Sequence, residues 1–142
     1  MKKLLLLLLI IGCEENSNII NSNVDALNGT WNLFSKIRTT EVNTIINIDT
    51  ISYNNEILLT FYQNKTYERY VNTSSEDTTY KGNYSLSDSI LTFEPENSPN
   101  TFFVNIILLG EDSLKWMYNS DIYAYANGDS VGTMIELSKW FK

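Results

Sequence analysis

Histidine is absent from the chain of 142 residues, and this absence excludes several kinds of chemistry. Histidine is the most frequent general base and transition-metal ligand, and the Ser-His-Asp centre of hydrolases depends on it. We therefore expect no catalytic residues, no metal site and no cofactor.

Cysteine is nearly absent as well, since Cys13 is the single one in the chain. A lone cysteine cannot form a disulfide framework, and the chain beyond it has no thiol nucleophile. Positive charge is also scarce, because ten lysines and arginines stand against seventeen acidic residues, for a net charge of −7. Without a basic cluster, the chain is unsuited to nucleic acid and to electrostatic binding of anionic lipid.

Long apolar runs are missing too, and the longest covers residues 4–11. A membrane-spanning helix needs about 20 apolar residues, so this run is too short to cross a bilayer. Lys2 and Lys3 precede the run and the small Gly12 follows it. This order is typical of a secretory signal peptide.

The end of this run, Ile10-Ile11-Gly12-Cys13, resembles the lipobox of bacterial lipoproteins. The resemblance implies cleavage before Cys13, lipidation of its thiol and acylation of the new amino terminus. We expect a signal peptide over residues 1–12, a lipidated tether over 13–26 and one domain over 27–142. Acyl chains on Cys13 would insert into the lipid bilayer and hold the domain at the outer membrane. Loss of Lys2 and Lys3 from a net charge of −7 leaves a mature chain of −9. The alternative is an unpaired cysteine near a mobile end.

The segment that follows Cys13 is polar and rich in asparagine, which is typical of a flexible tether. Thirteen flexible residues span roughly 20 Å, so the domain would lie close to the membrane. Glu14-Glu15 is similar to the acidic signals that send some Bacteroidetes lipoproteins to the cell surface. A merely solvated linker is the alternative, so both the periplasmic and the surface face stay open.

Alternating β-branched and aromatic residues, separated by turn residues, predict strands along the rest of the chain. In the first strand, Trp31 and Leu33, and further on Ser35 and Ile37, are expected to share one face. Segment 41–52 is either a weak strand or a loop, and segment 120–130 either extends a hairpin or forms a loop. The eight expected strands cover residues 29–40, 56–63, 66–73, 78–86, 89–93, 101–109, 113–119 and 131–140.

Consecutive hairpins without long crossovers predict an all-β fold, an eight-stranded antiparallel up-and-down barrel. Gly29 and Trp31 form a Gly-x-Trp that resembles the first lipocalin motif, and NKTYERY, GNYSLSDSILTF and EDSLKWMY resemble lipocalin-like lipoproteins of Bacteroidetes. The resemblance implies that Trp31 closes one end of the barrel. The family arginine that packs on this tryptophan has no match, and Lys139 is the nearest cation.

An eight-stranded barrel either holds one small ligand or is filled by its own side chains, and both alternatives stay open. Arg69 is a candidate anchor for a ligand carboxylate if it points inward, and a rim or surface residue otherwise. By alternation, the candidate lining consists of Leu59, Phe61, Tyr67, Arg69, Tyr84, Phe102, Val104, Trp116 and Tyr118.

The preferred hypothesis is a membrane-tethered barrel that binds a small apolar or amphipathic ligand in the cell envelope. The alternative is a filled barrel, a structural lipoprotein that docks a protein partner of unknown identity. An enzyme is the least favoured, since it would need a carboxylate pair such as Asp121 with Asp129, or Glu68 with Glu136. Asp121, Asn127 and Asp129 match no calcium-loop spacing.

Overall fold

The computed structural model describes residues 24–123 and 130–142. Within these residues, no helix is long and apolar enough to cross a bilayer. The elements are α1 (Val24–Leu27), β1 (Gly29–Val42), β2 (Ile45–Ser52), β3 (Ile57–Phe61), β4 (Thr66–Thr73), β5 (Glu76–Ser87), β6 (Ile90–Pro95), β7 (Phe102–Leu109), β8 (Ser113–Tyr123) and β9 (Ser130–Phe141).

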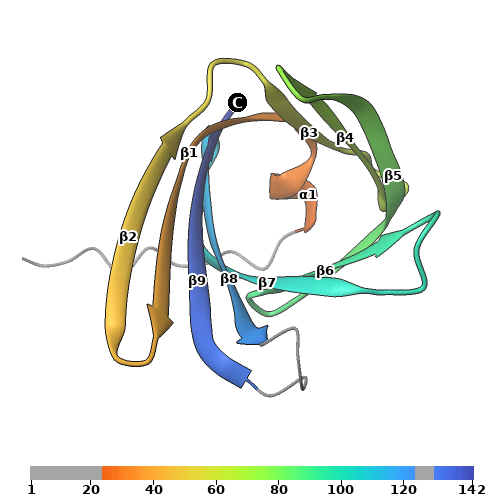
Figure 1. The fold of residues 1–142 in the computed structure, drawn as a ribbon. Coiled ribbons are helices and arrows are strands. Elements are labelled where there is room, and N and C mark those ends of the chain that lie inside the picture. Colours follow the sequence, from red (N-terminus) through yellow and green to blue (C-terminus); the bar gives the residue numbers. More distant parts are fainter. Residues whose placement is uncertain (1–23, 124–129) are drawn as a thin grey trace, which may run out of the picture.

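The strands form one antiparallel sheet that closes on itself because β9 pairs with β1 (Figure 1). From β3 to β9 each strand pairs with the next along the chain, as in a meander. Eight strands, β1 and β3 to β9, therefore make the ring. This architecture confirms the predicted eight-stranded up-and-down barrel.

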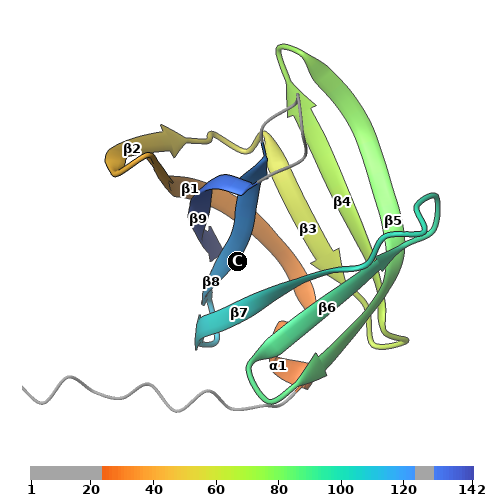
Figure 2. The same ribbon diagram turned by 60° about the horizontal axis from the view of Figure 1, so that its bottom comes forward.

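The ninth strand, β2, lies outside the ring (Figure 2). The first residues of β1, from Gly29 to Asn32, pair with β3, while its later residues, from Ser35 to Val42, pair with β2. Because β9 pairs with the other edge of β1, β2 and β3 follow each other along one edge. Segment 41–52 thus contains a strand, and all residues of β2 are exposed.

A β-bulge in β1 changes which side chains face the barrel interior. The pairing of β1 with β9 shifts register between Leu33 and Ser35. A bulge adds one residue to one strand and so reverses the alternation beyond it. Trp31 and Leu33 are fully buried before the bulge, and beyond it Lys36 faces the interior. The expectation that Ile37 shares the face of Trp31 is therefore wrong.

One end of the barrel is closed by α1 and by a densely packed core (Figure 2). Leu27 of α1 and Trp31 of β1 are fully buried there, beside Phe61 and Tyr84. Val24 and Ala26 were expected in the tether, but they pack partly buried against this core. The folded domain therefore begins a few residues earlier than the sequence indicated.

Candidate ligand cavity

The half of the barrel away from α1 is not filled, and it contains a cavity of about 570 Å³. Its wall comes from β1 and from β3 to β9, so the whole ring contributes. The exposed fractions of two wall residues, 46% for Tyr80 and 37% for Phe102, show that the cavity reaches the surface at the end opposite α1. The structure thus favours a barrel with internal space over a fully packed one.

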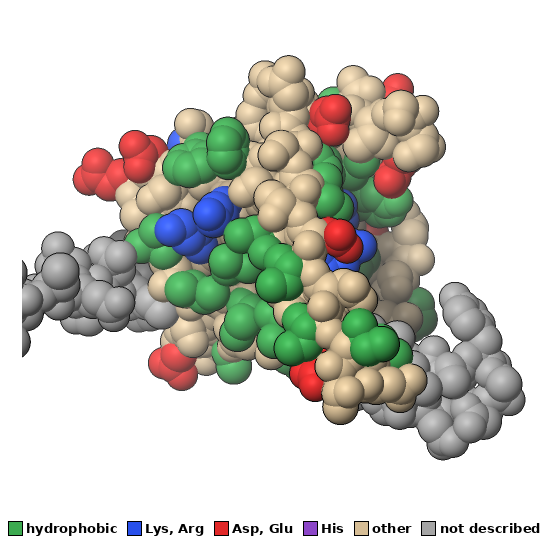
Figure 3. Space-filling view, turned by 60° about the vertical axis from the view of Figure 1, so that its left-hand side comes forward, with side chains coloured by type: hydrophobic (Ala, Val, Ile, Leu, Met, Phe, Trp, Pro, Cys, Tyr) green, Lys and Arg blue, Asp and Glu red, His purple; other side chains and the backbone are tan. Residues whose placement is uncertain are grey.

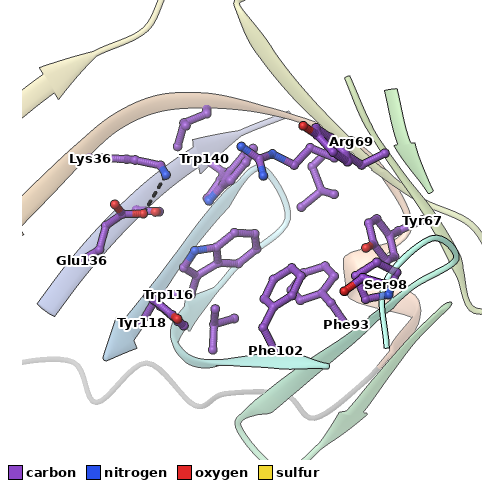
Figure 4. Close-up of a pocket in the computed structure, with 16 residues that line it drawn as sticks. Lys36, Tyr67, Arg69, Phe93, Ser98, Phe102, Trp116, Tyr118, Glu136 and Trp140 are labelled. Carbon is purple, nitrogen blue, oxygen red and sulfur yellow. Dashed lines mark ion pairs between the residues drawn. The ribbon is translucent and has the colours of Figure 1, made fainter. Parts of the chain in front are cut away.

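Aromatic rings form most of one side of this cavity (Figure 4). Phe93 and Phe102 stack with their ring centroids 4.7 Å apart, and Tyr67 meets Phe93 edge-on at 5.0 Å. Trp116 and Trp140 pack at 4.8 Å, and Trp116 also touches Phe93. Such a wall offers a large apolar contact area with phenol and indole groups at its margin.

A charged cluster occupies another part of the wall. Lys36 Nζ lies 2.6 Å from Oε1 of Glu136, and Arg38 Nη2 donates to Oε2 of the same carboxylate at 3.1 Å. Burial alone would raise the pKa of Glu136, but the hydrogen bonds and charges of Lys36 and Arg38 outweigh it and hold this pKa below its usual range. Glu136 is therefore a carboxylate at neutral pH, with both oxygens occupied by cations.

Arg69 of β4 faces the same cavity and is half-buried. Its guanidinium carbon lies 5.8 Å from the ring centroid of Tyr80, its cross-strand neighbour on β5. In Figure 4 the guanidinium points toward Trp140 and the Lys36–Glu136 pair. Among the described residues, no carboxylate forms an ion pair with Arg69.

Two buried donors in this region have no hydrogen-bond acceptor among the described residues. They are Nε1 of Trp140, which lines the cavity, and Nε of Arg38, which lies beside it. A buried donor left without an acceptor costs about 1–3 kcal/mol. Such groups are satisfied when water or a ligand supplies an oxygen.

Seven of the nine candidate lining residues lie on the cavity wall. They are Leu59, Tyr67, Arg69, Phe102, Val104, Trp116 and Tyr118. Phe61 and Tyr84 point inward but belong to the closed end, where their rings pack at 4.8 Å. The Tyr84 hydroxyl donates to the carbonyl of Tyr62 at 3.1 Å, so it serves the core rather than the cavity. Burial raises the pKa of both Tyr67 and Tyr84.

Several wall residues were not predicted from the sequence, above all Lys36, Glu136, Ser138 and Trp140. The bulge in β1 hid Lys36, because simple alternation places it outside. On β9, Glu136, Ser138 and Trp140 do alternate, and this pattern was a usable signal for an inward face with polar members.

The Gly-x-Trp motif lies at the closed end, as the resemblance implied. Nε1 of Trp31 donates to the carbonyl of Leu27 at 2.7 Å, which ties β1 to α1. Gly29 has a φ of 117°, a conformation that side chains rarely adopt. Lys142 Nζ lies 4.6 Å from the Trp31 ring centroid. The cation on this tryptophan is therefore Lys142, and the expected nearest cation, Lys139, lies beside Lys115 on the outer face.

The carboxylate pairs considered for catalysis are not brought together where they can be observed. Glu68 pairs with Lys81 at 2.6 Å on the exposed side of β4, whereas Glu136 lies in the cavity wall. The described part of the chain contains no group of acidic or other residues that could hold a metal ion. The Asp121 side chain, Asn127, Asp129 and Cys13 lie outside what the structure describes, so lipidation of Cys13 stays a prediction.

The outer face of β1, β2 and β9 carries many apolar side chains (Figure 3). Phe34 and Phe141 meet edge-on at 5.6 Å and have exposed fractions of 57% and 42%. The strand register places further apolar residues on the same face: Ile37, Ile46, Ile48, Ile135 and Leu137. We call these seven residues the outer apolar face.

Comparisons with known proteins agree with this architecture. The family model of the Lipocalin-like domain matches residues 27–116, which is more than half of the chain. A lipocalin-like protein from Bacteroides uniformis has a similar fold, with a TM-score of 0.50 and 17% identity over 82% of this chain and 98% of that one. An uncharacterized protein from Bacteroides eggerthii is similar with a TM-score of 0.50 and 11% identity over the same shares. No curated protein matches the chain. With its closed barrel, its Gly-x-Trp at the closed end and this family match, the chain belongs to the lipocalin-like family.

Proposed function

We propose that this protein binds a small apolar or amphipathic molecule in its barrel, and that acyl chains on Cys13 hold it at the cell envelope. The observation that carries the first part is the cavity of about 570 Å³. Ligand pockets in proteins usually measure about 300–1,000 Å³ and are mostly apolar with a few placed polar groups. The aromatic wall and the charged cluster fit that description.

The second part of the proposal rests on the sequence of the leader. Lys2 and Lys3, a short apolar run and Gly12-Cys13 form the order expected of a lipoprotein signal. A lipid anchor also suits an acidic chain, which has little attraction of its own for anionic membranes.

Native mass spectrometry of the mature domain, isolated under mild conditions from its own membrane, tests ligand binding. We expect a bound small molecule that is released on denaturation. Val104→Trp, which places a large ring in the cavity, should abolish the bound mass. Asn105→Trp, on the opposite side of the same strand, is the matched control and should retain it. A domain that is always free of ligand would contradict the proposal.

A second candidate function is docking of a protein partner, and the outer apolar face is the observation that favours it. Phe34, Ile48 and Phe141 are all more than two-fifths exposed. An exposed apolar patch of this kind marks interaction surfaces in many proteins. Among the described strands, β2 pairs only with β1, so its other edge is one to which another strand can add.

Cross-linking in intact membranes followed by purification tests this candidate. A stoichiometric partner should be captured by the natural protein and lost with Ile48→Lys, which places charge on the outer apolar face. Thr79→Lys, an exposed position on β5, should leave capture unchanged. Capture that is equal in both variants would exclude this face as the docking surface.

A further inference from the structure

The residues in and beside the cavity wall carry more positive than negative charge. Three cations, Lys36, Arg38 and Arg69, lie in or beside its wall, and Glu136 is the single carboxylate among the lining residues. The local excess is therefore two positive charges in a chain whose net charge is −7. An excess of positive charge in the wall of a cavity is the opposite of what the acidic composition of the chain predicts. It creates a local electrostatic field that attracts anions.

The one carboxylate among the lining residues is already paired with other cations. Both oxygens of Glu136 accept from Lys36 and Arg38, at 2.6 and 3.1 Å. Asp49 of β2 lies opposite Arg38 in the strand register, but no ion pair joins these two residues. Arg69 contacts the ring of Tyr80 instead, at 5.8 Å. Its guanidinium thus keeps donors that a ligand can use.

Donors without acceptors gather in the same region. Trp140 Nε1 and Arg38 Nε are buried and have no acceptor among the described residues. Figure 4 shows the Arg69 guanidinium directed toward Trp140. A site with several free donors matches a ligand group that only accepts, such as a carboxylate, sulfonate or phosphate.

The rest of the cavity has the opposite character. Phe93 and Phe102 stack on one another, and Trp116 and Tyr67 pack around Phe93, so this part of the wall is aromatic. A flat or flexible apolar body makes extensive contact with such a surface. The cavity therefore has a cationic, donor-rich pole and an apolar pole.

From these two poles we infer that the ligand is an anionic amphiphile. Its acidic head lies at the pole formed by Arg69, Lys36 and Trp140, and its apolar body lies against Phe93, Phe102 and Trp116. This inference rests on the proposed function, because it names the class of molecule that the same cavity takes. Arg69 is the residue that discriminates, since it alone among these cations has no carboxylate partner.

Two fluorescent molecules that differ by one negatively charged sulfonate group test the inference on the mature domain. One is 1-anilinonaphthalene-8-sulfonate, and the other is N-phenyl-1-naphthylamine, which has the same rings without the sulfonate. We expect the sulfonate to bind at least about tenfold more tightly, as a charge-assisted hydrogen bond in a buried site implies. Raising NaCl from about 50 to about 500 mM should weaken the binding of the sulfonate and leave the affinity for the neutral compound nearly unchanged.

Substitutions assign the effect to the cavity. Arg69→Met should remove the tenfold preference and leave the affinity for the neutral compound within about twofold. Lys81→Gln, which removes an exposed lysine on the outside of β5, should change neither affinity. Val104→Trp should reduce binding of both compounds, since it fills the space that they share.

The outcomes separate this inference from the proposed function. If both compounds bind in the cavity with equal affinity, and Arg69→Met affects neither, the cavity binds ligands but not acidic ones, and the inference is wrong. If neither compound binds and no natural ligand is found by mass, the proposed function itself is wrong. If Arg69→Met fails to fold, the salt dependence of sulfonate binding by the natural protein still tests whether the ligand's negative charge contributes to binding.

Discussion

Trp31 is the residue at which both chain ends of the folded domain meet. Its indole N–H donates to the carbonyl of Leu27, and Lys142 lies over its ring. Lys142 Nζ also donates to the carbonyl of Ala26 at 3.3 Å. One exposed side chain at the end of β9 therefore stabilises the junction between α1 and β1.

This arrangement predicts that Lys142→Gln lowers the free energy of unfolding by about 1 kcal/mol, because a cation on an indole face contributes roughly that much. Lys142→Arg should restore the natural stability, since Arg also binds aromatic faces. Lys139→Gln, which alters a lysine on the outer face, should have a free energy of unfolding within about 0.5 kcal/mol of that of the natural protein. Urea denaturation measures all three, and equal losses in the Lys142 and Lys139 variants would show that Trp31 is not involved.

Glu136 joins β9 to β1 through Lys36 and Arg38, and its protonation state is coupled to folding. Its pKa is lowered in the folded protein relative to the ordinary value of 4.5. A lowered carboxyl pKa contributes stability that is fully present above the unfolded pKa. That contribution is lost as the pH falls through the folded pKa.

We therefore expect Glu136→Gln to lower the free energy of unfolding by about 2 kcal/mol at neutral pH. This is less than the about 3–5 kcal/mol of a fully buried pair, since solvent screens its partly exposed cations. As the pH falls below the unfolded pKa the difference from the natural protein should shrink, because the unfolded chain then takes up a proton, and it should vanish once the folded carboxylate is protonated too. Urea denaturation from pH 3 to pH 7 checks this, with Glu111→Gln on an exposed loop as control. A constant difference across that range would contradict the linkage.

Alternation alone found Arg69, because β4 runs without a bulge and Tyr67 and Val71 mark its inner face. The same rule failed for Lys36, because the bulge in β1 depends on pairing with β9 from the far end of the chain. Phe61 was assigned to the right face but to the wrong depth. A period-two pattern says which side of the wall a residue faces, not how far along the barrel it lies.

At the scale of elements, β5 and β6 approach each other closely at Gly82. A Cβ placed on Gly82 would lie 2.2 Å from the carbonyl oxygen of Glu94, on the neighbouring strand. A side chain at this position therefore requires the two backbones to separate. In the strand register Gly82 lies between Tyr67 of β4 and Pro95 of β6, and the Tyr67 ring meets that of Phe93 edge-on.

Gly82→Ala should lower the free energy of unfolding by about 3 kcal/mol, the range of overpacking in a tight interior. Gly110→Ala is the control, because its Cβ would meet the rotatable Ser113 hydroxyl at 3.1 Å. We expect a change below about 1 kcal/mol there, measured by the same denaturation method. A harmless Gly82→Ala would mean that β5 and β6 can separate freely.

The hairpin of β3 and β4 was predicted within a residue or two, since its alternation is strict and a turn residue, Lys65, has a φ of 64°. β2 was harder to predict, because all its residues are exposed and no buried face requires its apolar and polar residues to alternate. Its place beside β3 on one edge of β1 depends on where the first strand bends, which local sequence does not encode.

At the scale of the whole molecule, the proposed anchor and the barrel lie in separate parts of the chain. The first element of the described structure is α1, and Cys13 precedes it by about ten residues. Cys13→Ser should therefore release the domain from the membrane fraction and leave its unfolding free energy unchanged. Membrane fractionation and urea denaturation measure the two effects. A variant that still sediments with membranes would show that something other than the acyl chains attaches it.

The closed end with α1 and Lys142 also sets the direction in which the barrel points. Both ends of the folded domain meet there, whereas Tyr80 and Phe102 mark the open end of the cavity on the other side. On the proposed function, a tether from Cys13 would reach the domain at this closed end, opposite the mouth of the barrel. That arrangement would leave the mouth open to the aqueous side, as suits a protein that takes its ligand from solution rather than from the membrane that holds it.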